Sequence, residues 1–379
     1  MNFELSEEQL AVQAAARDFA QTELLPGVIE RDTDQKFPIE QIKKMGELGF
    51  MGMMVDPKYN GGGMDTISYV LAMEEISKVD ASASVCMSVN NSLVCWGLES
   101  FGNEEQKEKY LKRLTTGEII GAFCLSEPEA GSDATSQRTT AEDKGDYYLL
   151  NGTKNWITNG KSASVYVVIA QTDASKRHKG INALIVERGM EGFVVGKKED
   201  KMGIRGSDTH SLMFTDVKVP KANRIGDDGF GFTFAMTALN GGRIGIASQA
   251  LGISAGAYEL ALKYSKERKA FGKHLSEHQA IQFKLADMAT KIDGARLLIW
   301  KAAYLKDQKK DFVKAAAMAK LYASQIAQEV TTEAVQIHGG YGYVKEYHVE
   351  RMMRDAKITQ IYEGTTEIQK MVISRELLR

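Results

Sequence analysis

The segment covering residues 361–369 reads Ile-Tyr-Glu-Gly-Thr-Thr-Glu-Ile-Gln and places one acid, Glu363, just before the expected start of a helix. Thr366 and Gln369 have the spacing of a capping box, which predicts that the helix begins about there. The first amides of a helix have no partner within it, so a carboxylate beside a free amide could hold a carbonyl and remove the proton next to it. This is the chemistry of proton abstraction α to a thioester. An acid at a helix start also interacts favourably with the helix dipole, so the segment alone leaves both interpretations open.

Two further segments combine hydroxyl, small and aromatic side chains. Residues 123–133 (Phe-Cys-Leu-Ser-Glu-Pro-Glu-Ala-Gly-Ser-Asp) supply hydroxyls, small residues and a tight turn. Residues 155–160 (Asn-Trp-Ile-Thr-Asn-Gly) place Trp156 and Thr158 two positions apart, and on a strand such a pair projects to one face. The pair could wall an aromatic ring and bond its polar edge. A plain turn and a core tryptophan are the alternatives for these two segments.

Two segments in the second half of the chain offer groups suited to a nucleotide. Residues 267–272 (Glu-Arg-Lys-Ala-Phe-Gly) set Arg268 and Phe271 near a glycine, a combination suited to phosphate and a flat base. Residues 336–342 (Gln-Ile-His-Gly-Gly-Tyr-Gly) contain glycines whose backbone amides could cradle a pyrophosphate. A solvated basic face and a helix C-cap are the alternatives here. No Gly-x-Gly-x-x-Gly motif follows an expected strand, so a Rossmann site is not indicated.

The composition is that of a globular protein and argues against several classes of function. With 379 residues, 43% of them apolar, the chain is long enough for two or three domains. A net charge of −2 with no basic domain makes nucleic acid an unexpected partner. Cys86, Cys95 and Cys124 form no Cys-x-x-Cys pair and the histidines form no ligand box, so we expect reduced cysteines and no metal. No signal peptide and no apolar run near about 20 residues is visible, so we expect a cytoplasmic protein without membrane insertion.

The elements that must position these segments fall into three expected domains. Residues 1–120 are expected to be helical, beginning with a capping-box pattern at Ser6 and Gln9. Residues 121–226 contain short β-rich runs separated by turn residues, which predicts an antiparallel β-sandwich or barrel. The expected strands cover residues 147–151, 165–171, 183–187 and 212–219.

Residues 227–379 are expected to form a four-helix bundle. No proline occurs after residue 220, and an interior proline would cost a helix about 3 kcal/mol, so long uninterrupted helices are the natural result. The expected helices cover residues 230–264, 275–307, 311–337 and 365–378. The predicted fold class is therefore α+β, mainly α.

Taken together and in this order, the five segments closely resemble the acyl-CoA dehydrogenase family, and the resemblance covers essentially the full chain. The family fold is similar to the organisation expected above, with an N-terminal helical domain, a middle β domain and a C-terminal four-helix bundle. Its members are flavoproteins that bind FAD without a Rossmann motif, usually as homotetramers. Residues 239–252 are most similar to the short-chain, butyryl-CoA branch.

The resemblance implies a role for each matched residue, with Glu363 as the catalytic base. The flavin would be contacted by Phe123, Cys124, Leu125, Ser126, Gly131, Ser132, Trp156, Ile157, Thr158, Thr365 and Glu367. The diphosphate and adenine side of FAD would meet Arg268, Phe271, His278 and Gln279 and, from a neighbouring subunit, Gln336, Ile337, His338, Gly339 and Gly340. The thioester ligand would contact Ser132, Leu239, Asn240, Arg243, Tyr362 and Gly364.

Two positions depart from patterns within the family, and at a third, Gly242, some branches of the family differ from this chain. Glu367 stands where many relatives carry glutamine, so an acid replaces a neutral donor at one cofactor contact. Asn240 stands where many carry aspartate, and asparagine keeps an acceptor while adding donors. Gly242 stands where the isovaleryl and long-chain branches carry their catalytic carboxylate. Glycine cannot abstract a proton, which agrees with Glu363 as the base.

The reaction that the resemblance implies is α,β-dehydrogenation of a saturated short-chain acyl-CoA to the trans-2-enoyl-CoA. Glu363 would remove the α proton, flavin N5 would take the β hydride, and an electron-transferring flavoprotein would receive the electrons. The alternatives are a medium- or branched-chain dehydrogenase, a decarboxylating glutaryl-type member and an acyl-CoA oxidase. A flavin-free CoA-binding or assembly module on the same scaffold is the alternative from a different class.

Overall fold

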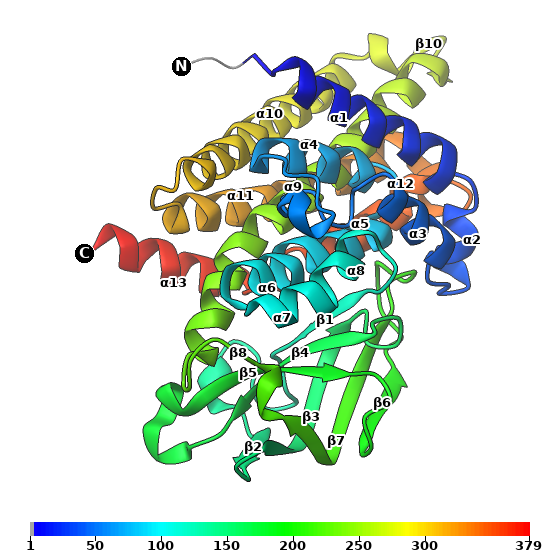
Figure 1. Cartoon of the computed structure of the whole chain (residues 1–379). Helices are drawn as coiled ribbons and strands as arrows, with labels where there is room; N and C mark the ends of the chain where they lie inside the picture. Colours follow the sequence, from blue (N-terminus) through cyan, green and yellow to red (C-terminus); the bar gives the residue numbers. More distant parts are fainter. Residues whose placement is uncertain (1–3) are drawn as a thin grey trace.

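The computed structural model describes residues 4–379, and Figure 1 shows layered helices above a β domain. The chain begins with helix α1 (Glu7–Phe19), capped by Ser6. The Ser6 hydroxyl accepts a hydrogen bond from the Gln9 amide while Gln9 Oε1 accepts one from the Ser6 amide, so the predicted capping box is confirmed. The helices that complete this domain are α2 (Val28–Thr33), α3 (Ile39–Glu47), α4 (Thr66–Ser77), α5 (Ala81–Ser88), α6 (Trp96–Phe101), α7 (Glu104–Gln106) and α8 (Lys112–Thr115).

Three π-helical segments interrupt these helices, and the sequence pattern did not predict them. They are η1 (Ala20–Leu24), η3 (Val89–Cys95) and η4 (Lys107–Leu111). A π segment inserts an extra residue into a helical turn and often occurs at a functional site. The segment η3 fits this tendency, because its Val89 and Leu93 line a cleft beside the β domain.

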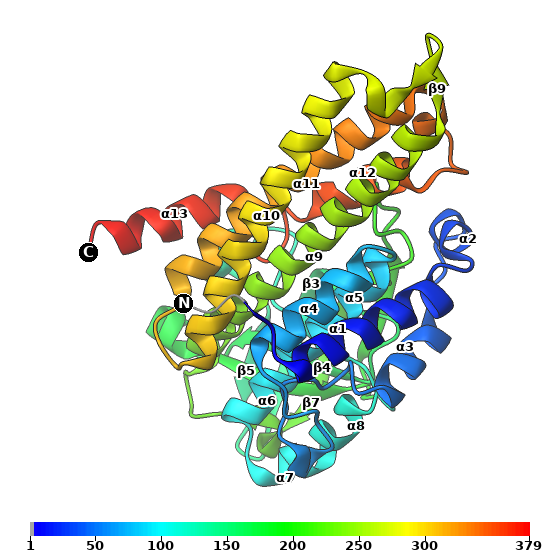
Figure 2. The same cartoon turned by 90° about the horizontal axis from the view of Figure 1, so that it is seen from above.

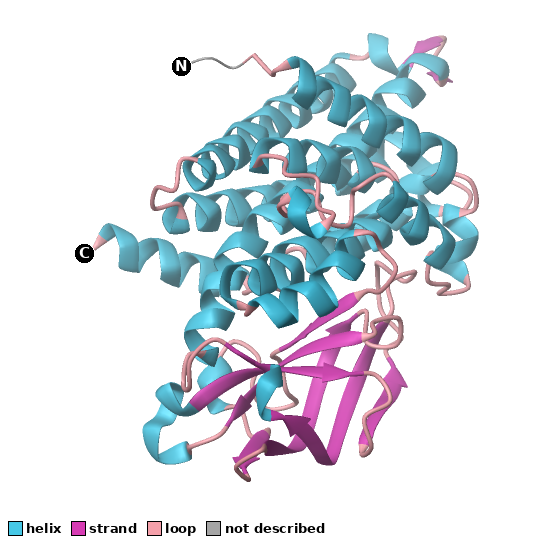
Figure 3. Cartoon of the chain, in the orientation of Figure 1, coloured by secondary structure: helices cyan, strands magenta, loops and turns pink. Residues whose placement is uncertain are grey.

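The β domain is one eight-stranded sheet in the order β6-β7-β3-β2-β4-β5-β8, with β1 beside β4. Most neighbours are antiparallel as predicted, but β1 and β2 both run parallel to β4, which corrects the purely antiparallel expectation. Figure 3 shows that the strands gather at one end of the molecule. They are β1 (Gly121–Cys124), β2 (Thr140–Asp143), β3 (Tyr147–Thr158), β4 (Val165–Gln171), β5 (Ile181–Glu187), β6 (Phe193–Lys198), β7 (Thr209–Pro220) and β8 (Arg224–Ile225).

Strand β4 belongs to two hydrophobic cores at once. Side chains alternate across a strand, so every second residue faces the same side. Val165, Val167 and Ile169 pack into the core shared with the helices. Tyr166 and Val168 pack into the separate core enclosed by the β domain. Each fully buried valine or isoleucine contributes about 1.5–3 kcal/mol, so this strand joins the sheet firmly to the helices.

The C-terminal part is a bundle of long helices, and Figure 2 shows α9, α10 and α11 side by side. A short hairpin, β9 (Lys269–Ala270) and β10 (Lys273–His274), connects the first two of them. Four of these helices differ from the expected ranges by a few residues at their ends, and the sequence did not predict the helix over residues 348–358. The helices are α9 (Gly231–Glu267), α10 (Gln279–Asp307), α11 (Val313–His338), α12 (His348–Ile358) and α13 (Thr366–Leu377).

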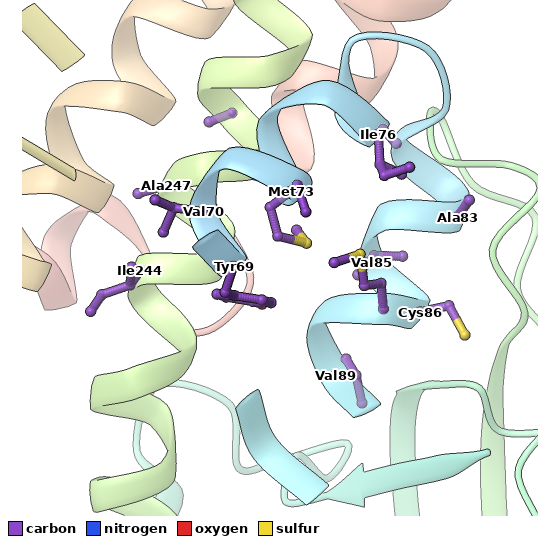
Figure 4. Packing of buried hydrophobic residues seen from close by; sticks show 14 of the residues in the cluster. Tyr69, Val70, Met73, Ile76, Ala83, Val85, Cys86, Val89, Ile244 and Ala247 are labelled. Atoms are coloured by element: carbon purple, nitrogen blue, oxygen red, sulfur yellow. The ribbon is translucent and has the colours of Figure 1, made fainter. Parts of the chain in front are cut away.

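Small residues on α9 let this helix approach α4 closely. A Cβ at Gly252 would lie 2.4 Å from the Glu74 carbonyl oxygen, and one at Gly245 would lie 2.6 Å from the Tyr69 hydroxyl. Figure 4 shows Tyr69 and Val70 of α4 packed beside α9. The predicted mainly helical α+β class, with helical, sheet and helical parts in that order, is confirmed. Within residues 4–379, none of the helices combines the length and apolar character needed to cross a membrane.

Candidate active site

A cleft of about 280 Å³ lies between the β domain and the helices and contains the acid singled out from the sequence. The β domain, the η3 segment, α9 and the loop before α13 all contribute to its walls. The residues that line it include Phe123, Leu125, Ser126, Gly131, Ser132, Trp156, Ile157, Thr158, Val89, Leu93, Leu239, Arg243, Tyr362, Glu363, Gly364 and Ile368. Segments far apart in the sequence therefore meet at one place, as the sequence predicted for most of these residues.

Glu363 stands on a sharp backbone corner. Its φ is +50°, in the left-handed region, and Gly364 follows with a φ of +92°. The side-chain amide of Gln369 donates to both the Gly364 carbonyl (2.9 Å) and the Glu363 carbonyl (3.3 Å). Lys320 Nζ donates to the same Gly364 carbonyl at 2.6 Å. Two side chains thus hold a conformation that costs a non-glycine residue of order 1–3 kcal/mol.

The cap of α13 differs by one residue from the prediction. Thr365, rather than Thr366, is the N-cap, because its ψ of 168° is extended and its hydroxyl accepts from the Ile368 amide. Gln369 therefore does not complete a capping box. Its side chain supports the corner that carries Glu363 instead, a role that residue spacing could not reveal.

The environment of the Glu363 carboxyl suits a base at neutral pH. Its Oε2 atom is buried and has no hydrogen-bond partner within residues 4–379. Burial raises the pKa of Glu363 to about 7, while the nearby cations Lys320 and Arg243 act in the opposite direction. A carboxylate with such a pKa accepts a proton more readily than an exposed one. Its backbone N–H also donates to no acceptor in that part of the chain, which leaves a donor beside the base.

The carboxyl group occupies the space that a side chain at position 242 would need. A Cβ on Gly242 would lie 2.2 Å from Glu363 Oε2 and 2.9 Å from Leu93 Cδ2. Just before Glu363, the Tyr362 hydroxyl donates to the Gln249 side-chain oxygen and ties the loop to α9. Sequence reasoning missed Gln249, since a glutamine in a run of small residues carries no local signal.

Trp156 forms part of the opposite wall in an unusual backbone conformation. Its φ is +57°, at a bulge between Lys154 and Ile157 where β3 and β7 lose register. The predicted alternation therefore fails at this point, although Trp156 and Thr158 still line the same cleft. The Trp156 side chain is 55% exposed, which is unusual for a large aromatic residue. An exposed ring plane beside hydroxyls fits a flat ligand with a polar edge.

Beneath this wall lies Lys154, a fully buried lysine that the sequence reasoning also missed. Its Nζ donates to the Leu125 carbonyl (3.0 Å), Glu127 Oε1 (2.7 Å) and Gln137 Oε1 (3.2 Å). Glu127 in turn accepts from the Thr139 amide at 3.1 Å. This cluster fixes the backbone on both sides of Ser126. The Cys124 side chain, next to this segment, points into the β-domain core rather than the cleft.

The remaining predicted cofactor residues do not line the Glu363 cleft. A second hollow, of about 520 Å³, lies at the far end of the bundle and is lined by Arg268, Leu275, Tyr264, Ile337, His338, Gly339, Gly340, Tyr341 and Val344. The Arg268 guanidinium lies 5.5 Å from the Tyr341 ring centre. Phe271, at the tip of the hairpin, is 98% exposed, and Gln279, Gln336 and Glu367 are also exposed. The predicted set is thus divided between two places in one chain.

Three predicted residues contribute through neighbours rather than through a cavity wall. His278 has its Nε2 atom 3.1 Å from the Ala270 carbonyl and so supports the hairpin. Asn240 accepts a hydrogen bond from Arg243 at 2.7 Å. Thr365 caps α13, as described above. Fold and cleft together define a class of protein in which helical, sheet and helical parts enclose one cleft, with a buried carboxyl oxygen and an exposed tryptophan in its walls.

Comparisons with known proteins identify the family to which the chain belongs. Models of the acyl-CoA dehydrogenase N-terminal, middle and C-terminal domains match residues 6–118, 122–217 and 229–378. A short-chain specific acyl-CoA dehydrogenase of Clostridium acetobutylicum is 50% identical, with 100% of each chain covered. The butyryl-CoA dehydrogenase of Megasphaera elsdenii is 50% identical with a TM-score of 0.98, again covering 100% of both chains. The chain belongs to the acyl-CoA dehydrogenase family.

A third similar chain comes from structural work on the electron transferring flavoprotein of Acidaminococcus fermentans and flavin-based electron bifurcation. It is 53% identical to this protein, has a TM-score of 0.99, and each chain is covered to 100%.

Proposed function

We propose that this protein is an FAD-dependent short-chain acyl-CoA dehydrogenase that converts a saturated acyl-CoA to the trans-2-enoyl-CoA. The observation that carries the proposal is the buried Glu363 carboxyl, with a pKa raised to about 7 and an unpaired oxygen in the cleft. The full-length similarity to short-chain and butyryl-CoA dehydrogenases supports the substrate class.

Glu363 removes the α proton of the thioester, and its own free backbone N–H donates a hydrogen bond to the thioester oxygen, on which negative charge develops. Burial serves both tasks, because exclusion of water makes the carboxylate more basic and strengthens the hydrogen bond. The corner held by Lys320 and Gln369 keeps the base in place during the transfer. Bound FAD supplies the acceptor for the β hydride.

The cleft residues present fit the flavin ring of FAD. Trp156 offers an exposed ring plane, and the hydroxyls of Ser126 and Thr158 line the same wall. Lys154 holds the backbone beside Ser126 and so pre-orders the wall. We assign the thioester ligand to the helical side of the cleft, where Leu239, Arg243, Tyr362 and Gly364 lie, with Ser132 at its edge.

We assign the diphosphate and adenine side of FAD to the far hollow, with Arg268 as its cation. Residues 337–340 line this hollow and do not line the Glu363 cleft, which supports a homotetramer in which a neighbouring subunit contributes the segment 336–340. The exposure of Phe271, 98% in one chain, supports an interface at the hairpin. We also propose that the three domains cover residues 1–120, 121–226 and 227–379.

For the electron acceptor we propose an electron-transferring flavoprotein, supported by the similar chain from the Acidaminococcus fermentans work. A cytoplasmic location is proposed as well, and it fits three buried cysteines that form no disulfide. An oxidase would instead produce peroxide when substrate is added in air. A flavin-free module would be colourless and would not take up FAD.

The deciding experiment is Glu363→Gln, which keeps the size of the side chain but removes the base. Purified variant and wild type are mixed anaerobically with butyryl-CoA while the flavin absorbance is followed. We expect the variant to retain FAD and to lose bleaching by at least about 10³-fold, because the general base is absent. A bleaching rate near that of wild type would exclude Glu363 as the base.

A further inference from the structure

Lys320 is a fully buried lysine on α11 that no motif in the sequence singled out. Its side chain is 0% exposed, and the hydrogen bond of its ammonium goes to the Gly364 carbonyl at 2.6 Å. Within residues 4–379, no carboxylate lies within ion-pair distance of Nζ. Burial of an unpaired ammonium costs several kcal/mol, so stability alone does not account for a lysine at this position.

The hydrogen bond to the Gly364 carbonyl does not by itself account for a lysine at position 320 either. Gln369 already donates to the Gly364 carbonyl at 2.9 Å, so the corner has a neutral donor in place. What distinguishes Lys320 is its charge. The charged groups that influence it are Glu363 and Glu367, which favour its protonated form, and Arg243, which opposes it.

The positive charge of Lys320 acts on the Glu363 carboxyl. Lys320 is the largest electrostatic influence that favours the ionised form of Glu363, followed by Arg243 from α9. Arg243 is itself influenced by Glu363 and by Arg375 on α13. Because Glu363 Oε2 has no hydrogen-bond partner, its ionised form depends on these two cations. Burial also lowers the pKa of Lys320 to about 7, so this ammonium and the carboxyl respond to the same pH range.

Resting on the proposed function, we propose that Lys320 is a positioning residue for proton abstraction. It holds the Gly364 carbonyl, and through it the left-handed Glu363 corner, while its charge favours the carboxylate that accepts the proton. Lys320 touches neither substrate nor cofactor in this role, and its charge acts on Glu363 only while its ammonium is protonated.

The test uses the FAD-loaded enzyme with Lys320→Met, which keeps the length of the stem and removes both donor and charge. Lys314→Met is the matched control, since Lys314 lies on the same helix but is exposed. The first readout needs no turnover: the carboxylic-acid stretch of Glu363 is titrated by infrared difference spectroscopy, with Glu363→Gln to identify the band. The second is the pH dependence of anaerobic flavin bleaching by butyryl-CoA.

We expect both midpoints to rise by about one pH unit in Lys320→Met, with bleaching at pH 7 slowed about tenfold and FAD content unchanged. The control should match wild type in both. Unchanged midpoints would overturn the proposal, even with slower bleaching, because a purely structural lysine would lower the rate equally at every pH.

A second variant covers the case in which Lys320→Met fails to fold. Lys320→Gln keeps a donor for the carbonyl and removes only the charge, so the same upward shift of the infrared midpoint is expected from it. If wild type is bleached by no acyl-CoA, the proposed function fails, but the infrared titration still decides whether Lys320 acts on Glu363.

Discussion

The two walls of the cleft each contain one fully buried lysine, and the two lysines are held in opposite ways. On the β side, Lys154 has three acceptors, one of them the Glu127 carboxylate at 2.7 Å. On the helical side, Lys320 has one carbonyl, and its nearest acids act from a distance. A paired lysine stabilises structure, whereas a sparsely paired one leaves its charge free to act on a neighbour. The comparison predicts that changes in the β wall affect stability and FAD retention, while changes in the helical wall affect the protonation and placement of Glu363.

The largest effect is expected from Lys154→Met on the β wall. Removal of one partner of a buried ion pair costs about 3–5 kcal/mol, because Glu127 stays buried without its cation. Urea unfolding and the ratio of FAD to protein after gel filtration measure the loss. Lys161→Met, at an exposed site just after β3, is the control. The double change Lys154→Met with Glu127→Gln should lose less than the single one, and a larger loss would contradict the ion-pair account.

Gly242→Ala on the helical wall should leave stability and FAD content near wild type but slow flavin bleaching about 10²-fold. The new methyl group would need the space of Glu363 Oε2, 2.2 Å from the added carbon, so the carboxylate must move by about 1 Å. Stopped-flow bleaching with butyryl-CoA measures the effect. Gly241→Ala is the matched control, since nothing lies within 4 Å of a Cβ there. Equal rates for both variants would show that the carboxylate tolerates the displacement.

The pH dependence of flavin bleaching by the wild type tests the role of the helical wall further. Because Glu363 must be ionised to accept a proton and its pKa is about 7, bleaching should rise with pH through about 7 and fall about tenfold per unit well below it. Lys154→Met should keep this midpoint even if it binds FAD weakly. A midpoint near 4.5, the ordinary value for glutamate, would contradict a buried base.

The smallest effect is expected from Tyr362→Phe. This change removes the hydroxyl that donates to Gln249 and leaves a buried acceptor without its donor, which costs about 1–2 kcal/mol. The loop that carries Glu363 loses one of its ties to α9, so bleaching should slow by less than about tenfold at an unchanged midpoint. Thermal unfolding and bleaching rates measure both. A rate loss as large as that of Gly242→Ala would place Tyr362 closer to the chemistry than proposed.

Periodicity and turn residues act locally, and they predicted the order of the three structural blocks. Most of the residues around the cleft were predicted only by the resemblance of five segments to a known family. The sequence did not predict the left-handed conformation of Trp156, since a bulge depends on how β3 pairs with β7. The sequence also placed the cap of α13 at Thr366 rather than Thr365, because only Thr366 has a glutamine three residues later, as a capping box requires. The buried lysines escaped notice for a related reason: nothing near Lys154 or Lys320 in the sequence distinguishes them from surface lysines. Burial of a charge is decided by tertiary packing.

Strand β4, with one face in each hydrophobic core, sets a mechanical limit on how the enzyme admits its ligand. A clamshell opening that separated sheet from helices would expose the valines and the isoleucine of that strand to water, at a cost of several kcal/mol. We therefore expect acyl-CoA to enter the cleft without separation of the sheet from the helices. Entry by this route keeps bulk water away from Glu363 while the thioester binds. Release of the product then requires small local motions and no movement of whole domains.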